Sequence, residues 1–419
     1  MPNNEQLEVF LGRQPILDRN QQLFAYKLLF RDGPLATGNR ADILDPTQAT
    51  ATVIANTFTE LATNNALGPY RGFISIDHEL LFSDLIEALP PQLAAFEILD
   101  TVAPTTEVVA RCQQLHEHGF TLVIDDIEDI SADYLPLLAL VDIIKVDIMK
   151  MDADRLRVVV AQFIPFGKKL LAEKVETIEQ FSLCHSLGFD LFQGYFFARP
   201  TIIVGKKLNP SQLSLIRLLG LILEDAETDA IENAFKLEPG LTVNMLRLTN
   251  SVSCSLATKI TSLRHAITIL GRRQLQRWLQ LLIYTDPKGA TQDTPPLLQL
   301  AATRGRLMEL LADREHARNR EFSDQAFMVG IISLMPALIG MAMEDIVEQL
   351  PVALRVKQAL TGYGGAHGQL LRLVEATEQT DPVVLEEALH GHPAINMDFL
   401  GNCLTQALSW ANHLGQEQA

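Results

Sequence analysis

Five polar residues interrupt short apolar runs in the first half of this chain, and each follows the previous one after 20 or 28 residues: Glu97, Asp125, Lys145, Glu173 and Gln193. The runs around them have the composition of buried β-strands. A charge on a buried strand is strongly unfavourable unless a partner or a metal ion satisfies it. Five such positions at near-regular spacing therefore predict one shared site.

The carboxylates of this set, with the neighbouring Asp126, predict a site for hard divalent cations. Oxygen ligands of this kind suit one or two Mg²⁺ or Mn²⁺ ions, and the candidate ligands are Glu97, Asp125, Asp126 and Glu173. Lys145 could hold an attacking water or neutralise a phosphate, and Gln193 could orient a water or a ligand. Metal-assisted hydrolysis of a phosphodiester is the chemistry that this set suits. The alternative is a buried ion-pair network in which Lys145 neutralises Asp125 and Glu173.

The elements that must position these residues alternate between short apolar runs and amphipathic, helix-like stretches. This alternation is typical of a parallel α/β sheet. We expect strands at 73–76, 95–99, 120–125, 143–148, 169–175 and 191–197. The sequence lacks the glycine-rich phosphate loop of an open doubly wound sheet. One polar residue per strand instead favours a closed (β/α)8-like TIM-type barrel, which collects its chemistry at the carboxyl ends of several strands.

The segments before and after this alternating region have other patterns. Residues 8–17 and 22–31 predict a hairpin of two strands, and residues 46–63 predict a helix. After residue 204 the strand signal disappears, and breakers separate the helix-like stretches. We expect helices at 210–224, 241–249, 262–284, 295–313, 323–340, 343–359, 367–379 and 394–413. The sequence therefore predicts an α/β domain at 1–204 and an all-α domain at 205–419.

Composition narrows the partners. The net charge is −17, and residues 1–204 contribute −13 of it, with 28 acidic against 15 basic residues. An acidic chain is poorly suited to bind phosphate backbones, so we expect no nucleic-acid partner. The four cysteines have no Cys-x-x-Cys spacing, and the start of the chain does not have the pattern of a secretory signal. The most apolar stretch, Met328 to Met343, is shorter than a membrane span. We therefore expect a cytoplasmic protein without a membrane span.

Several motifs of the first half, in this order and spacing, resemble those of the bacterial EAL domain. They are Tyr-Lys-Leu-Leu-Phe-Arg (26–31), Phe-Glu-Ile-Leu-Asp (96–100), Ile-Asp-Asp (124–126), Ile-Lys-Val-Asp (144–147), Ala-Glu-Lys-Val-Glu-Thr (172–177) and Gln-Gly-Tyr-Phe-Phe-Ala-Arg-Pro (193–200). The resemblance covers about residues 8–200. It implies a (β/α)8-like barrel, whose active members hydrolyse cyclic di-GMP with two divalent metal ions.

The resemblance also implies roles for individual residues. The acidic positions of the metal site correspond to Glu97, Asp125, Asp126 and Glu173. Lys145 corresponds to the lysine near the nucleophilic water, Gln193 to a late glutamine and Glu176 to a supporting glutamate. Arg31 corresponds to an arginine that contacts the ligand.

Three positions depart from the family pattern. The Glu-Ala-Leu that gives the family its name is Lys27-Leu28-Leu29 here, so an ammonium replaces a metal-binding carboxylate. An ammonium has only donors and cannot bind a metal; it could instead pair with Glu97 or Asp125. Ser75 stands where an asparagine is expected, and residues 127–131 replace a glycine-bearing loop that supports metal binding and dimerisation in the family. We therefore expect Lys145, Glu173 and Gln193 to be vestigial and the chain to lack phosphodiesterase activity.

The second half resembles an HDOD domain, a helical output module related to metal phosphohydrolases of the HD type. The resemblance covers about residues 205–410 and is strongest at Asn250-Ser251 and from Ala266 to Gly271. Ser333-Leu334 stands where those hydrolases have a His-Asp pair, so we expect no metal site here. The basic residues Arg264, Arg272, Arg273 and Arg277 predict either a solvated face or a surface that docks onto an acidic partner, including the chain's own barrel.

Together these features predict a bacterial signal-transduction protein with a degenerate EAL domain and a non-catalytic HDOD domain, acting through other signalling proteins. No cofactor is expected, unless Mg²⁺ or Mn²⁺ still occupies the vestigial site. Two alternatives stay open: a receptor that binds cyclic di-GMP without cleaving it through Arg31, Gln193 and the acidic cluster, and a weak phosphodiesterase. Self-association into a homodimer also stays open.

Overall fold

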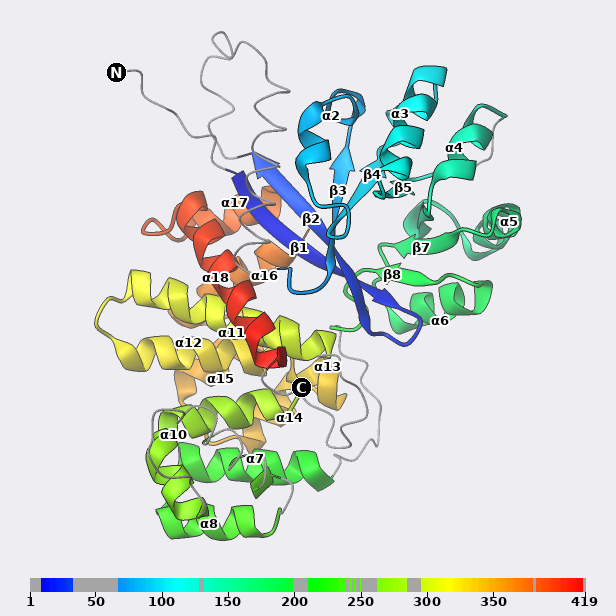
Figure 1. The fold of residues 1–419 in the computed structure, drawn as a ribbon. Helices are drawn as coiled ribbons and strands as arrows, with labels where there is room; N and C mark the ends of the chain where they lie inside the picture. The colour runs from blue at the N-terminus through cyan, green and yellow to red at the C-terminus, as the bar shows by residue number, and fades with distance from the viewer. Residues whose placement is uncertain are drawn as a thin grey trace, which may run out of the picture. The chain divides into compact units, whose positions relative to one another are not determined.

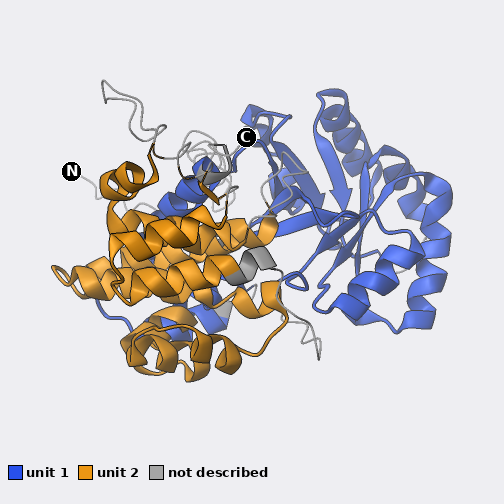
Figure 2. Cartoon of the chain, turned by 90° about the horizontal axis from the view of Figure 1, so that it is seen from below, with its two compact units in different colours: residues 1–199, 373–419 blue, residues 200–372 orange. Residues whose placement is uncertain are grey.

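A computed structural model divides the chain into two compact units. One comprises residues 1–199 and 373–419, and the other comprises residues 200–372 (Figure 2). The residues that the structure describes are 9–32, 67–127, 132–198, 210–238, 241–242, 245, 249, 262–284, 295–379 and 382–416. The predicted helix at 46–63, most of the one at 241–249 and the domain boundary after residue 204 lie outside these ranges and stay predictions.

Eight strands close into a barrel in the order of the sequence (Figure 1). They are β1 Val9–Asp18, β2 Leu23–Asp32, β3 Arg71–Ile76, β4 Ala94–Ile98, β5 Thr121–Ile124, β6 Ile143–Asp147, β7 Lys169–Glu173 and β8 Leu191–Gln193. Strand β1 pairs antiparallel with both β2 and β8, and the other neighbours are parallel. The predicted hairpin and parallel strands are confirmed, and the barrel is mixed because β1 runs against its neighbours.

The helices between the later strands lie around the outside of the barrel (Figure 1): α2 His78–Leu81, α3 Thr106–Glu117, α4 Leu135–Leu140, α5 Ala153–Phe163 and α6 Ile178–Leu187. Their ends follow from local sequence. Thr177 and Gln180 form a reciprocal capping box at the start of α6, and Gly188 ends it in the left-handed region at φ 100°. These caps fix where α6 begins and where it ends before β8.

An apolar layer fills the barrel interior below the mouth, which is the end where the parallel strands finish. Each strand contributes one residue to this layer. Its members are Ile16, Ala25, Phe73, Ala95, Val123, Ile143, Leu171 and Leu191. All are buried. Because successive residues on a strand point to opposite sides, the residue two positions further along also faces inward. The apolar layer therefore determines which side chains form the next layer toward the barrel mouth.

The C-terminal segment groups with the barrel, which the sequence did not predict. Helix α18, Met397–Gln416, contacts β1, and a Cβ placed on Gly68 would meet the Asn412 side chain at 3.5 Å. The Tyr195 hydroxyl also donates to the carbonyl oxygen of Glu378. Helix α17, Pro382–His390, belongs to the same segment.

The second unit is helical throughout its described residues, as predicted: α7 Pro210–Leu223, α8 Thr228–Lys236, α10 Leu263–Leu282, α11 Pro296–Glu315, α12 Arg320–Ile332, α13 Met335–Ile339, α14 Met343–Gln349 and α15 Leu354–Gly362; α16, Gly365–Glu378, begins in this unit. Two predicted helices are each broken in two. Pro336 lies in the first turn of α13, and Leu350 before Pro351 has an extended ψ of 128°. A proline disfavours helical backbone angles in the residue before it, which explains the second break.

One stretch of the chain, Arg320–Ile339, is long and apolar enough to cross a membrane, judged by length and composition. However, 78% of its most apolar window is buried inside the structure, as in the core helix of a soluble protein. Its residues Phe327, Ile331 and Met335 are packed in the interior of the unit. The absence of a membrane span therefore stays a prediction.

Candidate functional site

A polar layer lies next to the apolar layer on the side of the barrel mouth. It takes one residue from each strand, except that Asp125 directly follows the end of β5. We define it as Gln14, Lys27, Ser75, Glu97, Asp125, Lys145, Glu173 and Gln193. Seven of these residues follow their apolar partner by two positions. Gln14 precedes Ile16 by two because β1 runs antiparallel. All five polar residues of the sequence pattern, with Lys27 and Ser75, are thus in one layer.

Lys27 lies at the centre of one side of this layer. Its ammonium donates to both the Ser75 hydroxyl and Oε2 of Glu97. In the strand register Lys27 pairs with Phe73, whereas Ser75 pairs with Glu97. The long lysine side chain therefore spans the two-residue offset toward the barrel mouth. Of the two partners expected for Lys27 from the sequence, Glu97 and Asp125, the structure shows the ion pair with Glu97.

Burial explains the electrostatics of this pair. Glu97 has no exposed surface, and Lys27 is 6% exposed. Burial lowers the pKa of Lys27, although the adjacent Glu97 opposes that shift. Burial would raise the pKa of Glu97, but the ammonium groups of Lys27 and Lys145 outweigh burial and hold that pKa below its usual value. The arrangement is a buried ion pair.

Lys145 connects the other carboxylates of the polar layer. Its Nζ lies 2.9 Å from Oε1 of Glu173, 3.1 Å from Oδ1 of Asp125 and 3.5 Å from Oε2 of Glu97. Burial lowers the pKa of Lys145, but the three carboxylates outweigh burial and raise it. The alternative interpretation of the sequence, an ion-pair network around Lys145, therefore describes these contacts.

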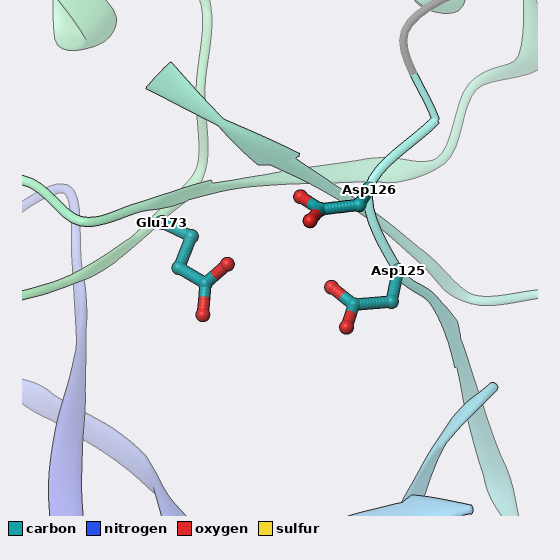
Figure 3. A group of neighbouring side chains, drawn as sticks. All are labelled: Asp125, Asp126 and Glu173. Carbon is teal, nitrogen blue, oxygen red and sulfur yellow. The ribbon is translucent and has the colours of Figure 1, made fainter. Parts of the chain in front are cut away.

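Asp125, Asp126 and Glu173 form the other side of the site. One carboxylate oxygen from each lies within 4.8 Å of the others, and Figure 3 shows the three carboxylates directed into a common space. Asp126 adopts a left-handed backbone, φ 51°, and Lys150 Nζ lies 3.0 Å from its Oδ2. Burial, with help from Glu97 and Glu173 and against Lys145, raises the pKa of Asp125 to about 6. This donor set could hold one hard cation.

The remaining candidates are placed differently. Gln193 is buried and donates from Nε2 to Oε1 of Gln14 over 2.8 Å. Arg31 lies in β2, and its side chain is outside the described part of the structure. Glu176 is half-buried, and its backbone N–H donates to Gln180. The structure therefore gives Gln193 a structural partner and leaves the ligand-binding role of Arg31 a prediction.

Sequence reasoning missed Gln14 and the outer ion pairs. Gln14 lies between Arg13 and Pro15, so no apolar run marks it in the sequence. Lys174 Nζ lies 2.6 Å from Oδ2 of the buried Asp147. The hydrogen bond to Asp147 raises the pKa of Lys174. Lys150 and Lys174 thus place two further ammonium groups near the acidic side of the site.

The helical unit shows what stands in place of a His-Asp pair. Ser333 caps the C-terminal end of α12, donates to the carbonyl of Gly330 and accepts from Arg304 at 2.7 Å. Leu334 is buried. Among the described residues, the unit contains no group of three side chains able to hold a metal ion. The contacts of Ser333 are therefore those of a residue that stabilises the end of α12.

The basic residues on and near α10 are paired within their own unit. Glu309 and Asp324 both lie within ion-pair distance of Arg273 and Arg277. The outer arginines have acidic partners as well: Arg264 pairs with Asp229 and Glu232, and Arg272 with Asp225. Each of the four arginines therefore has an acidic partner within its own unit. The solvated face and the docking surface both stay predictions.

Comparisons with known proteins fit this architecture. Residues 44–200 match the EAL domain family, and residues 213–359 match the HDOD domain family. The uncharacterized protein YuxH of Bacillus subtilis is 30% identical over 414 residues, which are 97% of this chain and 99% of YuxH. The cyclic di-GMP phosphodiesterase CdgJ of Vibrio cholerae is 32% identical over 377 residues, which are 89% of this chain and 85% of CdgJ. A solved EAL domain protein of Listeria monocytogenes matches 46% of this chain and 88% of its own, at 21% identity and a TM-score of 0.38.

The fold and the polar layer thus define a barrel protein with an appended helical domain. This chain belongs to the family of proteins in which an EAL domain is followed by an HDOD domain. The resemblance seen in the sequence is confirmed for both halves. The matches to YuxH and CdgJ cover 97% and 89% of this chain, so they extend over both halves.

Proposed function

We propose that this chain is a cytoplasmic signalling protein of cyclic di-GMP pathways whose barrel does not hydrolyse the dinucleotide, and that it acts by binding other proteins. The link to cyclic di-GMP rests on the nearly full-length relationship to CdgJ, which is named as a phosphodiesterase of that compound. The loss of hydrolysis rests on one observation, the ion pair between Lys27 and Glu97.

The ion pair matters because metal-assisted hydrolysis needs carboxylate oxygens to hold the ions that generate hydroxide. An ammonium offers only donors, and Lys27 already occupies an oxygen of Glu97. Divalent ions, when bound, would supply the nucleophile and stabilise the developing charge. In this chain an ammonium stands at position 27 and contacts Oε2 of Glu97, so the carboxylates needed for a second divalent ion are not available.

The helical unit supports action through partners. Ser333 is engaged by Arg304 and Gly330, and the sequence contains no His-Asp dipeptide. Among the residues that the structure describes, neither unit then offers a complete hydrolytic centre. A protein whose two domains resemble hydrolase folds but have incomplete centres is suited to signalling by recognition.

Turnover tests this proposal directly. Purified chain would be incubated with cyclic di-GMP and Mn²⁺, and linear dinucleotide would be quantified by chromatography. We expect no product above a Glu173→Ala control, because Glu173 belongs to the only candidate cation cluster among the described residues. Product that the wild-type chain forms and the control does not would reject the proposal in favour of a weak phosphodiesterase, which the three clustered carboxylates favour.

Binding of cyclic di-GMP without turnover is the second candidate. The relationship to CdgJ favours it, and so do two buried acceptors, Oε1 of Glu97 and Oε1 of Gln193, which have no hydrogen-bond partner among the described residues. Calorimetric titration separates the two functions. Measurable heat with a defined stoichiometry and no product would identify a receptor, whereas no heat would leave interaction with proteins as the function.

A further inference from the structure

The polar layer contains two sides with different capacities for cations. On one side, the ammonium of Lys27 is held by the Ser75 hydroxyl and Glu97 Oε2. On the other, Asp125, Asp126 and Glu173 direct their carboxylates into a common space (Figure 3). The fold family implies two divalent ions in this region. The two sides can therefore be tested separately against that expectation.

The Lys27 side does not fit a divalent ion. A metal ligand must offer a lone pair, and an ammonium has none. Lys27 is 6% exposed, so its charge is poorly screened and would repel a second cation. It also lies against Glu97, which has no exposed surface and would otherwise be a buried carboxylate. Lys27 thus supplies the positive charge that this carboxylate needs.

The acidic side retains the features of a cation site. Oδ1 of Asp126 is buried and has no hydrogen-bond partner among the described residues, although Lys150 contacts Oδ2. The wholly buried Glu97 also has an oxygen, Oε1, without a partner in the described part of the chain. Its other oxygen shares Lys145 with Asp125 and Glu173. Unpartnered oxygens next to three clustered carboxylates are the donor set that a hard cation uses.

We propose that Lys27 is a tethered replacement for one of the two divalent ions, so that the barrel binds a single divalent cation at Asp125, Asp126 and Glu173. This inference rests on the proposed function and deepens it, because it states which half of the site survives. The ammonium groups of Lys145 and Lys150 compete with the cation for these carboxylates, so its binding is weak. The competition follows from the contacts, since Lys150 pairs with Asp126 and Lys145 pairs with Asp125 and Glu173.

The test counts the Mn²⁺ ions bound per chain. Equilibrium dialysis and the electron paramagnetic resonance signal of the free ion both measure this number. We expect one ion per wild-type chain. The double variant Lys27→Glu with Ser75→Asn should bind two, and the matched control Lys27→Met with Ser75→Asn should bind one, because it loses the charge but gains no carboxylate. Asp126→Asn should weaken the wild-type site roughly tenfold or more. Lys150→Met should tighten it roughly two- to fivefold, because it removes a competing ammonium.

Each contrary outcome overturns a defined part of the inference. Two ions in the wild-type chain, or none at millimolar Mn²⁺, would overturn it. So would a second ion in the Lys27→Met control, because Lys27 would then only exclude the ion by its charge. Circular dichroism before each titration confirms that the variant is folded, and the exposed Lys150 variant keeps the inference testable if the Lys27 variants do not fold. If the wild-type chain hydrolysed cyclic di-GMP while binding one Mn²⁺ ion, the proposed function would be rejected and this inference would stand.

Discussion

Lys27 of β2 and Glu97 of β4 form an ion pair across the intervening strand β3, with the Ser75 hydroxyl as a third member. Both charged side chains are buried. A carboxylate at position 27 would face Glu97 as a like charge and would need a cation between them. The lysine removes that need, because it balances Glu97 with a charge that belongs to the chain. On this side of the barrel mouth the positive charge next to Glu97 is therefore the Lys27 ammonium.

The first prediction concerns the stability that this pair provides. Lys27→Met should lower the free energy of unfolding by about 3 kcal/mol, because breaking a buried pair leaves an uncompensated charge. Lys145, 3.5 Å from Glu97, keeps the loss from being larger. Urea unfolding followed by circular dichroism measures the difference. Lys150→Met is the matched control, because its ion pair is 39% exposed on the lysine side and should contribute less than about 1 kcal/mol. Equal losses for both variants would contradict the account.

The second prediction is a pH dependence. The pKa of Asp125 is raised from 3.8 to about 6 in the folded chain. Between about pH 4 and pH 6 the folded chain keeps this proton while the unfolded chain releases it, so the unfolding free energy falls as the pH rises through that window. We expect a fall of about 2 kcal/mol from this residue. Asp125→Asn cannot titrate, so its stability relative to the wild type should increase from pH 4 to pH 7. A constant difference between the two proteins would contradict the assignment.

The third prediction tests the contact between α11 and α12. A Cβ added to Gly330 would lie 2.7 Å from Cα of Gly305, so the two helix backbones touch there. Gly330→Ala should lower the free energy of unfolding by about 1–3 kcal/mol through overpacking. Gly362→Ala is the control, because nothing lies within 4 Å of its added Cβ. That variant should be neutral or slightly stabilised. Thermal unfolding measures the stability of both variants. Equal stability changes for Gly330→Ala and Gly362→Ala would contradict the close contact between α11 and α12.

The sequence contained enough to predict the polar layer because strand periodicity is simple. In β3 to β8 each polar residue follows a buried apolar residue by two positions, so a pattern of apolar runs identifies both layers. Gln14 escaped this reasoning because β1 runs in the opposite direction. The two-residue offset between Lys27 and Ser75 is also a property of the register. Register depends on strand pairing across the barrel, which a single sequence does not specify.

Other features depended on long-range contacts or on local backbone geometry. The left-handed turn at Asp126, which places consecutive aspartates in one cluster, has no distinctive sequence signal because it uses a non-glycine residue. The sequence did not reveal the acidic partners of the α10 arginines, because Asp225, Glu309 and Asp324 lie 32 to 51 residues from them. The break at Pro351, by contrast, could have been predicted from the proline.

We infer that Lys27 separates this barrel from a two-ion hydrolase, and turnover in paired variants measures this effect. Wild-type chain and the Lys27→Glu with Ser75→Asn variant would be assayed side by side with cyclic di-GMP and Mn²⁺, with Glu173→Ala added to each as a control. We expect no Glu173-dependent product from the wild type and measurable product from the variant. Any Glu173-dependent product from the wild-type chain would contradict this role of Lys27.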